Sequence, residues 1–254
     1  MKLPSEFIER TKPVLVDEWD NFLIALNESS PTSIRINIDK VDRTASSSVP
    51  WASNGFYLAQ RPQFTFDPLF HAGCYYVQEA SSMFIEQAMR QYIPDRIKVL
   101  DLCAAPGGKS TLIASLLDDN SLLVSNEVIR SRANILSENI TKWGQSNVVV
   151  TNNDPAQIGK IKDFFDAIVV DAPCSGEGMF RKDEGAIAEW SVDNVKLCKE
   201  RQQRILYDIW PALKSGGLLL YSTCTYNLEE NEENVKWIRD KLGAEVLPVE
   251  IREE

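Results

Sequence analysis

The spacing of apolar residues changes near residue 70 of the chain. From residue 5 to 28 the apolar side chains recur at helical intervals, and Pro13 is expected to divide this stretch into two short helices. The segments that follow alternate apolar and polar residues, which is typical of strands. These expected strands cover 33–38 and 56–58. The pattern predicts a small N-terminal α+β domain over residues 1–70.

Residues 71–254 show strands that alternate with helices. The expected strands are 97–101, 121–127, 147–151, 165–171, 217–222 and 244–248, and the expected helices are 109–117, 130–143, 192–213 and 228–242. The strands are apolar almost without interruption, as strands are when helices cover both faces of a sheet. This pattern predicts an α/β domain with a buried, mostly parallel sheet.

Acidic residues stand where four of these strands end. They are Asp101, Glu127, Asp154 and Asp171. Ligands of open α/β sheets bind beyond the carboxyl ends of the strands, so these positions are candidates for a ligand site. Glu127 follows the first turn by about 20 residues, the spacing at which an acid reaches ribose hydroxyls in Rossmann-type sites. Any one of these acids alone also fits an ordinary solvated turn.

The first turn, Asp-Leu-Cys-Ala-Ala-Pro-Gly-Gly-Lys-Ser, ends like a phosphate-binding P-loop. That motif requires a glycine where this chain has Cys103, which disfavours an ATP or GTP site. Small side chains in the turn still let a ligand approach the backbone closely. The turn therefore predicts a ligand other than a nucleoside triphosphate.

The cysteines suggest chemistry rather than cross-linking. The chain has five cysteines, no Cys-x-x-Cys pair and one histidine, so a disulfide framework, a zinc site or catalysis by several histidines is not expected. Cys174 and Cys224 follow two strands in turn-like sequences, and their thiols are expected to face one crevice. Cys74 and Cys198 are expected to be core residues, which is the usual place of a single cysteine.

Composition limits the partners and the compartment. The formal net charge of −10 argues against a broad nucleic-acid footprint. No apolar run approaches the roughly 20 residues of a membrane span. The first residues lack the apolar segment of a signal peptide, so a cytoplasmic protein without a membrane partner is expected.

At this point the motifs carry a family resemblance. The chain resembles the NOL1/NOP2/Sun group of RNA 5-methylcytosine methyltransferases, whose bacterial members act on ribosomal RNA. The matching segments are 31–37, 76–82, 101–109, Asn126-Glu127 with Arg132, Asp154, 171–176, 178–182 and 222–225. The resemblance covers nearly the whole chain. It implies a Rossmann-like class I methyltransferase sheet over residues 71–254, with an RNA-recognition-like domain over 1–70.

The resemblance implies S-adenosyl-L-methionine as the cofactor. Its methionine part would lie along Cys103, Ala104, Ala105, Pro106, Gly107, Gly108 and Lys109. Glu127 would bind the ribose hydroxyls and Arg132 would support it. Asp154 would lie beside the adenine, and Asp171 would lie beside the reaction centre.

The resemblance also assigns the two strand-end thiols. Cys224 would add to C6 of cytosine and make C5 nucleophilic, which is covalent catalysis, and Cys174 would assist the later release. Asp171 would hydrogen-bond the N3/N4 edge of the base. A free thiol has a pKa near about 8.5, so a cation is expected to help Cys224 ionise, with Lys109 as the first candidate and Lys182 as the second. No metal is expected.

The expected partner is RNA, with ribosomal RNA favoured over tRNA and DNA not expected. Phosphate contacts are expected from Arg35, Arg61, Arg181 and Lys182, and Tyr75, Tyr76 and Phe180 are candidates to stack on bases or to belong to the core. Relatives carry a closing strand and often a C-terminal RNA-binding domain that this sequence does not supply. We therefore expect weak RNA binding by a chain without that domain. Separately, we expect a monomer.

Three other functions stay open at the level of sequence. A P-loop nucleoside triphosphatase is disfavoured by Cys103. A noncatalytic RNA-binding or assembly protein is disfavoured because Lys109, Asp171, Cys174 and Cys224 are all present. A methyltransferase acting on another pyrimidine or on protein is compatible with the fold, although two cysteines favour cytosine C5.

Overall fold

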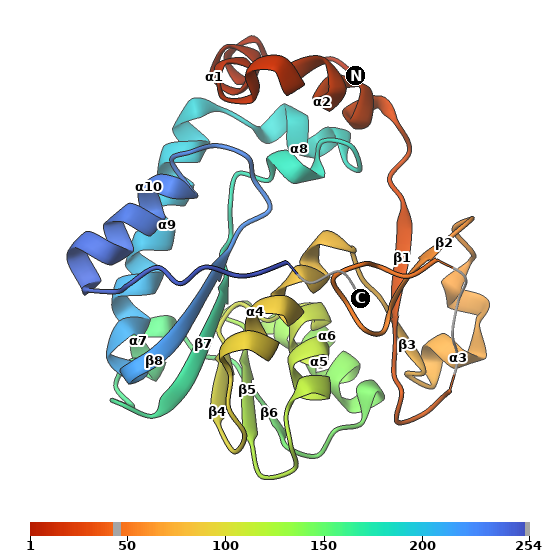
Figure 1. The fold of residues 1–254 in the computed structure, drawn as a ribbon, viewed down its shortest axis with the longest axis vertical. Helices are drawn as coiled ribbons and strands as arrows, with labels where there is room; N and C mark the ends of the chain where they lie inside the picture. The colour runs from red at the N-terminus through yellow and green to blue at the C-terminus, as the bar shows by residue number, and fades with distance from the viewer. Residues whose placement is uncertain (43–46, 252–254) are drawn as a thin grey trace. The chain divides into compact units, whose positions relative to one another are not determined.

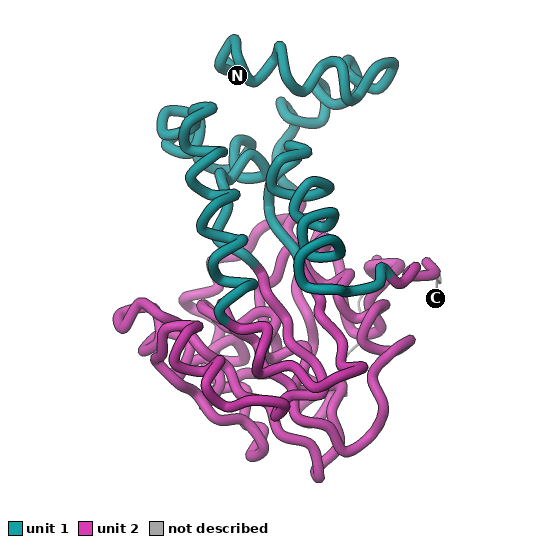
Figure 2. The backbone as a smooth tube through the Cα atoms, turned by 90° about the vertical axis from the view of Figure 1, so that its left-hand side faces the viewer, with its two compact units in different colours: residues 1–30, 172–208, 222–246 teal, residues 31–171, 209–221, 247–254 magenta. Residues whose placement is uncertain are grey.

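The computed structural model describes residues 1–42 and 47–251 of the chain. The backbone divides into two compact units, each built from separate stretches of sequence, coloured teal and magenta in Figure 2. Unit 1 comprises residues 1–30, 172–208 and 222–246, and unit 2 comprises 31–171, 209–221 and 247–254. Each unit is described by itself below.

A five-stranded sheet forms the centre of unit 2 (Figure 1). Its strands are β4 (Lys98–Asp101), β5 (Leu122–Asn126), β6 (Val148–Thr151), β7 (Phe165–Asp171) and β8 (Leu213–Ser222). They lie in the order β6-β5-β4-β7-β8, and β4 pairs in parallel with both β5 and β7. The prediction of a mostly parallel α/β sheet is confirmed. The order reverses direction at β4, so its carboxyl end lies at a topological switch point.

Apolar residues of the strands pack against the covering helices. Val99, Leu123 and Val169 are fully buried in the sheet and pack with Ile113 of the helix α5. The helices of this part are α4 (Ile85–Tyr92), α5 (Gly108–Leu116), α6 (Arg130–Trp143) and the short α7 (Pro155–Ile158). The helix α6 ends at the predicted residue because Gly144 takes a left-handed conformation, with φ of 100°, that other residues rarely adopt.

Unit 2 also contains a small antiparallel sheet in the order β2-β1-β3. Its strands are β1 (Thr32–Ile36), β2 (Gly55–Leu58) and β3 (Tyr75–Val77). The first two were predicted and the third was not, because three residues carry too little alternation to recognise. Two short helices, η2 (Phe64–Phe66) and α3 (Pro68–His71), connect β2 to β3, and η3 (Ser81–Phe84) follows β3.

Unit 1 is largely helical (Figure 2). It includes α1 (Ser5–Leu15), η1 (Val16–Glu18), α2 (Trp19–Asn27), η4 (Glu177–Met179), α8 (Glu184–Glu189), nearly all of α9 (Val192–Ile209), α10 (Glu232–Trp237) and η6 (Ile238–Leu242). Its core joins distant segments, since Phe7 of α1 meets Phe180 edge to face at 5.1 Å and Trp190 at 5.6 Å. Aromatic pairs of this geometry stabilise a core beyond the area they bury.

Several predicted boundaries are wrong. Pro13 lies inside α1, and the break falls later, at Val16, whose positive φ of 48° ends the helix. The long helix expected over 192–213 ends at Ile209 and is followed by η5 (Trp210–Ala212), because Pro211 cannot donate a helical hydrogen bond.

The last predicted elements also differ from the structure. The helix expected from residue 228 begins at Glu232. The strand expected over 244–248 is wrong, because these residues have no regular secondary structure. Among the helices of the described ranges, none combines the length and apolar character of a membrane span. The domain division at residue 70 stays a prediction.

Candidate active site

The turn after β4 is shaped by its glycines and alanines. Gly107 has φ of 113°, a left-handed conformation that leads into the first residue of α5. Ala104 and Ala105 are buried against Leu136 of α6, so they anchor the turn on its inner side. The small side chains predicted to admit a ligand therefore also pack the turn onto the domain.

Hydrogen bonds from neighbouring elements hold this turn in place. The Ala104 amide donates to the carbonyl of Asn126 at the end of β5, at 2.8 Å. From α6, Arg132 Nη2 donates to the Ala105 carbonyl and Asn139 Nδ2 to the Pro106 carbonyl, both at 2.8 Å. The turn is thus preorganised by contacts that do not need a ligand.

Asp101 is a fully buried carboxylate at the end of β4. Its Oδ2 accepts a hydrogen bond from Ser110 at 2.6 Å, while the described residues offer its Oδ1 no hydrogen-bond partner. Burial raises the pKa of Asp101 to about 7. A buried acceptor left unpaired costs free energy, so the turn suits a ligand that brings a donor or a cation to this atom.

Glu127 is the second buried carboxylate of the turn region. Its Oε1 accepts from the Ile129 amide at 2.9 Å, and its Oε2 lies 3.4 Å from Arg132 Nη1. A carboxylate has about four acceptor positions, so Glu127 keeps capacity for two ligand hydroxyls. Arg132 bridges Glu127 and the turn.

Lys109 and Asp171 form an ion pair within unit 2. Lys109 Nζ lies 2.8 Å from Asp171 Oδ2 at the end of β7. Because the cation fixes the carboxylate at the carboxyl edge of the sheet, Asp171 is oriented before any ligand binds.

Asp154 forms a hydrogen bond within its own segment. Its Oδ1 accepts from the Ala156 amide at 2.9 Å and caps α7.

Cys103 follows Asp101 in the same turn. Burial, with the carboxylates of Asp101, Glu127 and Asp171 nearby, raises the pKa of the Cys103 thiol well above its usual range. The Cys103 side chain therefore stays a neutral thiol near pH 7, suited to packing and not to nucleophilic attack.

The two strand-end cysteines of unit 1 lie against each other. Their sulfurs are 3.0 Å apart, and the Cys224 amide donates to Cys174 Sγ at 3.3 Å. The contact with the second sulfur, together with burial, raises the pKa of Cys174. Cys224 is exposed, whereas Cys174 is only partly so. Cys174 therefore stays a neutral thiol near pH 7, and either sulfur can donate the hydrogen bond between them.

A buried carboxylate, Glu177, joins the two cysteine loops. Its Oε2 accepts from the Thr225 hydroxyl at 2.6 Å and from the Tyr226 and Asn227 amides at 2.7 and 2.9 Å. The Trp190 indole donates to its Oε1 at 3.0 Å. Glu177 therefore binds the backbone just after Cys224 to its own loop.

Glu230 is a second buried carboxylate that accepts hydrogen bonds from residues of both cysteine loops. It is fully buried and accepts from the Ser175 amide at 3.1 and 3.3 Å, from Gln202 at 2.7 Å and from Asn227 at 2.8 Å. Sequence reasoning missed both glutamates, since a glutamate in a turn or in an acidic helix start normally indicates a solvated residue. Only its position just after the Cys174 loop distinguished Glu177.

Gly178 allows the two loops to touch. Its amide donates to the Cys224 carbonyl at 2.8 Å, and a Cβ at this position would lie 2.7 Å from that oxygen. No side chain fits at that distance, so glycine is required for this close approach of two backbones.

The structure also corrects some predicted contacts and supports others. Arg35 is wrong as a phosphate contact, because it is 2% exposed and bonds to Gln78 and Thr111. Tyr75 and Phe180 are buried and belong to cores, which excludes them from base stacking. Cys74 and Cys198 are buried, as predicted. The absence of a metal and the roles of the site residues stay predictions.

Comparison with known families and curated proteins gives consistent matches. A family model described as 16S rRNA methyltransferase RsmB/F matches residues 91–254, and one for the N-terminal domain of 16S rRNA methyltransferase RsmF matches residues 3–80. The ribosomal RNA small subunit methyltransferase F of Pectobacterium carotovorum subsp. carotovorum (strain PC1) is 35% identical over 255 residues, covering 93% of this chain and 53% of that protein. The protein of the same name from Vibrio cholerae serotype O1 (strain M66-2) is 36% identical, covering 97% and 56%. The chain spans about half the length of the curated relatives it matches.

Solved structures share the fold. A methyltransferase homologue from Pyrococcus horikoshii superimposes with a TM-score of 0.83 at 30% identity, covering 97% of this chain and 82% of that one. The structure of NSun6 from Pyrococcus horikoshii with SFG gives a TM-score of 0.78 at 21% identity, covering 94% and 87%. The second likeness concerns the fold alone.

Proposed function

The chain belongs to the RsmB/F family of 16S rRNA methyltransferases, and from this premise we propose that it methylates C5 of a cytosine in ribosomal RNA through a covalent cysteine adduct. The observation that carries the proposal is the approach of Cys174 and Cys224 to 3.0 Å. One thiol is enough to add to C6 of the cytosine. A second thiol at this distance can assist the release of the first from C6 after methylation.

S-adenosyl-L-methionine is the proposed cofactor, and it supplies an electrophilic methyl group. The turn from Cys103 to Lys109 would hold its methionine part, with the unpaired Asp101 Oδ1 available to its ammonium group. Glu127 would accept from the two ribose hydroxyls, and Asp154 would lie beside the adenine. The assignments of the turn, Asp101 and Glu127 are supported by the small side chains and acceptor capacity described above, and that of Asp154 by the family resemblance.

The residues of the chain would act one after another in the reaction. The target base must first leave its stack, as bases do in enzymes that act on them. Cys224 then adds as a thiolate to C6, and electron density moves to C5, while Asp171, oriented by Lys109, accepts a hydrogen bond from the N3/N4 edge. After methylation the C5 proton passes to solvent water, the electron pair of the C5–H bond forms the C5=C6 double bond, and Cys224 leaves C6 as a thiolate. The Cys174 thiol donates a hydrogen bond to the departing sulfur.

The proposal extends to partners and organisation. Residues 1–70 would contribute RNA contacts and residues 71–254 the catalytic domain. The chain would act as a monomer on RNA in the cytoplasm, with neither DNA nor a membrane as partner. Light scattering after gel filtration tests the monomer, and a dimer at micromolar concentration would contradict it.

The decisive experiment traps the adduct. We would incubate Cys174→Ala with S-adenosyl-L-methionine and unmodified 16S rRNA fragments and resolve the products on a denaturing gel. A protein–RNA adduct should persist, and adding Cys224→Ala should abolish it. Cys198→Ala is the matched control, because Cys198 is a buried core cysteine of the same unit, and it should turn over without accumulating adduct.

Two results would contradict the proposal. Cofactor binding by calorimetry together with no adduct in any variant would overturn covalent catalysis by this pair. Adduct formation that survives Cys224→Ala would assign the nucleophile elsewhere.

A further inference from the structure

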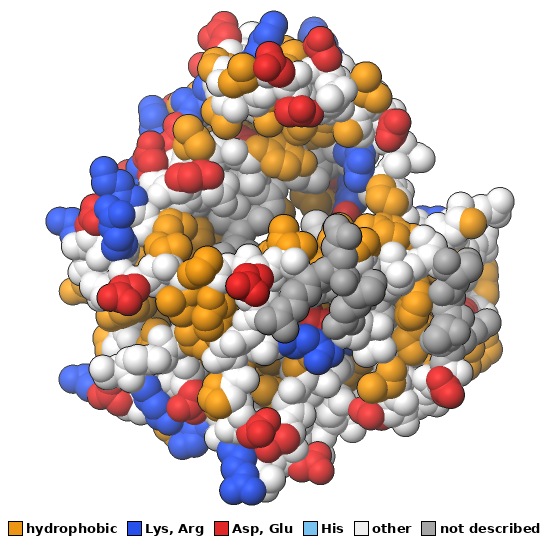
Figure 3. Space-filling model, viewed as in Figure 1, with side chains coloured by type: hydrophobic (Ala, Val, Ile, Leu, Met, Phe, Trp, Pro, Cys, Tyr) orange, Lys and Arg blue, Asp and Glu red, His pale blue; other side chains and the backbone are white. Residues whose placement is uncertain are grey.

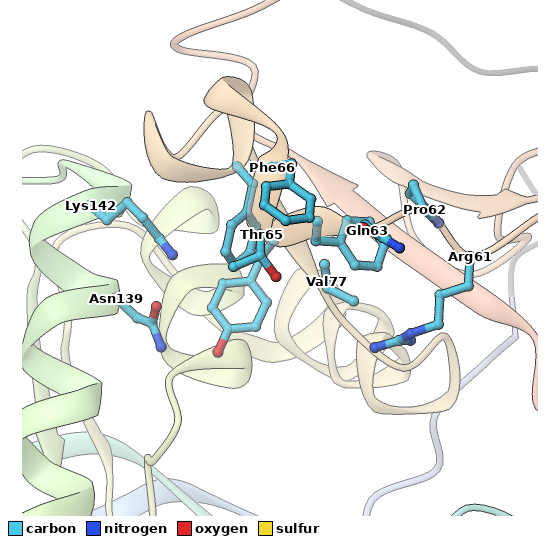
Figure 4. Close-up of a pocket in the computed structure, with 11 residues that line it drawn as sticks. Arg61, Pro62, Gln63, Thr65, Phe66, Val77, Asn139 and Lys142 are labelled. Carbon is cyan, nitrogen blue, oxygen red and sulfur yellow. The ribbon is translucent and has the colours of Figure 1, made fainter.

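A pocket of about 610 Å³ opens on unit 2, away from both cysteine loops in sequence. One wall is the segment 61–66, and the other is formed by Asn139 and Lys142 of α6 (Figure 4). The amine of Lys142 and the amide of Asn139 point from the helix toward this segment, and Arg61 lies across from them in the same view. The pocket is therefore a built cleft between two elements and not a dent in one loop.

The chemistry of the lining is selective. Phe66 is 81% exposed, an unusual state for a large aromatic side chain that packs against nothing on its outer side. The lining residues contribute two cations, Arg61 and Lys142, and no carboxylate. The chain as a whole carries a net charge of −10, and acidic and basic side chains are interspersed over the face shown in Figure 3. A cationic pocket with an exposed ring is thus distinct from the average surface.

The floor of the pocket adjoins the turn that follows β4. Tyr76 lines the pocket, and a Cβ built on Gly108 would lie 3.4 Å from Tyr76 Cε1. Burial raises the pKa of Tyr76 to about 12, so the phenol remains protonated and able to donate at neutral pH. The same ring therefore contacts both the pocket and the proposed cofactor turn.

We propose that this pocket binds an unpaired base of single-stranded RNA, stacked on Phe66, with the flanking phosphates held by Arg61 and Lys142. It is a docking subsite distinct from the base that reacts, and it rests on the proposed function only in that the substrate is RNA. Exposed aromatic rings beside cations, with amides such as Gln63 and Asn139 at the edge, are the groups that single-stranded nucleic acids require. An acidic protein would use the cations but would gain nothing from the exposed ring.

The test measures binding by the full chain. The probe is a fluorescein-labelled, unstructured RNA of about 12 nucleotides, followed by fluorescence anisotropy at low salt. Phe66→Ala should weaken binding about tenfold, the effect of losing one stacked base. Arg61→Ala should weaken it and lower the salt-dependence slope by about 0.7. The matched controls are Tyr207→Ala, an exposed aromatic of α9, and Lys160→Ala, an exposed cation outside the pocket.

The outcomes separate this subsite from the proposed function. If Phe66→Ala and Arg61→Ala bind the probe like the two controls while the wild type methylates ribosomal RNA, the subsite is overturned and the function stands. If Phe66-dependent binding occurs without methylation of any RNA, the subsite stands and the function falls. Equal affinity of the wild type for an oligoglutamate peptide of matching charge, lost in Arg61→Ala, would assign the pocket to an acidic protein and overturn the proposal.

Discussion

Asp101 offers the sharpest quantitative test, because one substitution removes its charge and keeps its shape. In the native chain burial raises the pKa of Asp101 from 3.8 to about 7. Between these two pH values the folded protein keeps the proton, whereas the unfolded chain releases it. Stability therefore falls as pH rises from about 4 to about 7, and the full penalty is present above pH 7.

The magnitude follows from the size of the shift. A pKa difference of about 3 units corresponds to about 4 kcal/mol, of which about 3 kcal/mol develops between pH 5 and pH 8. In Asp101→Asn this pH dependence is absent, but one buried amide atom replaces the unpaired Oδ1 and costs about 1–3 kcal/mol. Relative to the wild type, the variant should gain about 3 kcal/mol of stability between pH 5 and pH 8 and should be the more stable of the two at pH 8.

Urea unfolding, followed by tryptophan fluorescence at several pH values, measures this difference. Asp166→Asn is the control, because Asp166 pairs with Lys214 and has a lowered pKa, so its effect stays constant between pH 5 and pH 8. The free energy of unfolding of Asp101→Asn, relative to that of the wild type, should rise with pH. If it does not, the buried carboxylate is ionised in the folded protein and the reasoning fails.

Three further outcomes follow from the geometry of the two units. Glu230→Ala leaves the Ser175, Gln202 and Asn227 donors unpaired and should cost about 3–5 kcal/mol in urea unfolding, against about 1–2 kcal/mol for Glu230→Gln; equal costs would mean that the hydrogen bonds do not matter. Gly178→Ala should lower the methylation rate at least about tenfold without changing the Kd for S-adenosyl-L-methionine, since its Cβ would displace the Cys224 backbone; an unchanged rate would refute the close approach. Arg132→Met should raise that Kd by calorimetry about threefold to tenfold, and it should also lower the melting temperature because the Ala105 carbonyl and the buried Glu127 lose this partner; a normal Kd would remove Arg132 from the site.

Local patterns in the sequence were enough to predict the parallel sheet and the turn after β4. The strands β4 to β7 are short apolar runs bounded by turn residues, and such runs form parallel strands wherever helices cover them. The helix α6 was predictable to the residue because Gly144 ends it by its own backbone preference. The conformation of the turn after β4 was equally local, because Gly107 adopts a left-handed φ of 113° that other residues rarely take. The expected strand at 244–248 failed for the opposite reason, because an alternating segment forms a strand only if another strand is there to pair with it.

The distances that make the site work were decided only by the tertiary structure. Cys174 and Cys224 are 50 residues apart in the chain and 3.0 Å apart in space; their positions after two strands predicted a shared crevice but not this direct contact. Glu177 and Glu230 became buried partners of the cysteine loops because packing removed them from water, after which hydrogen bonds to the loops were the way to satisfy their charges. Sequence determined which groups are present and which strands they follow. Long-range packing decided which of them are buried, which are paired, and which atom, such as Asp101 Oδ1, has no hydrogen-bond partner among the described residues.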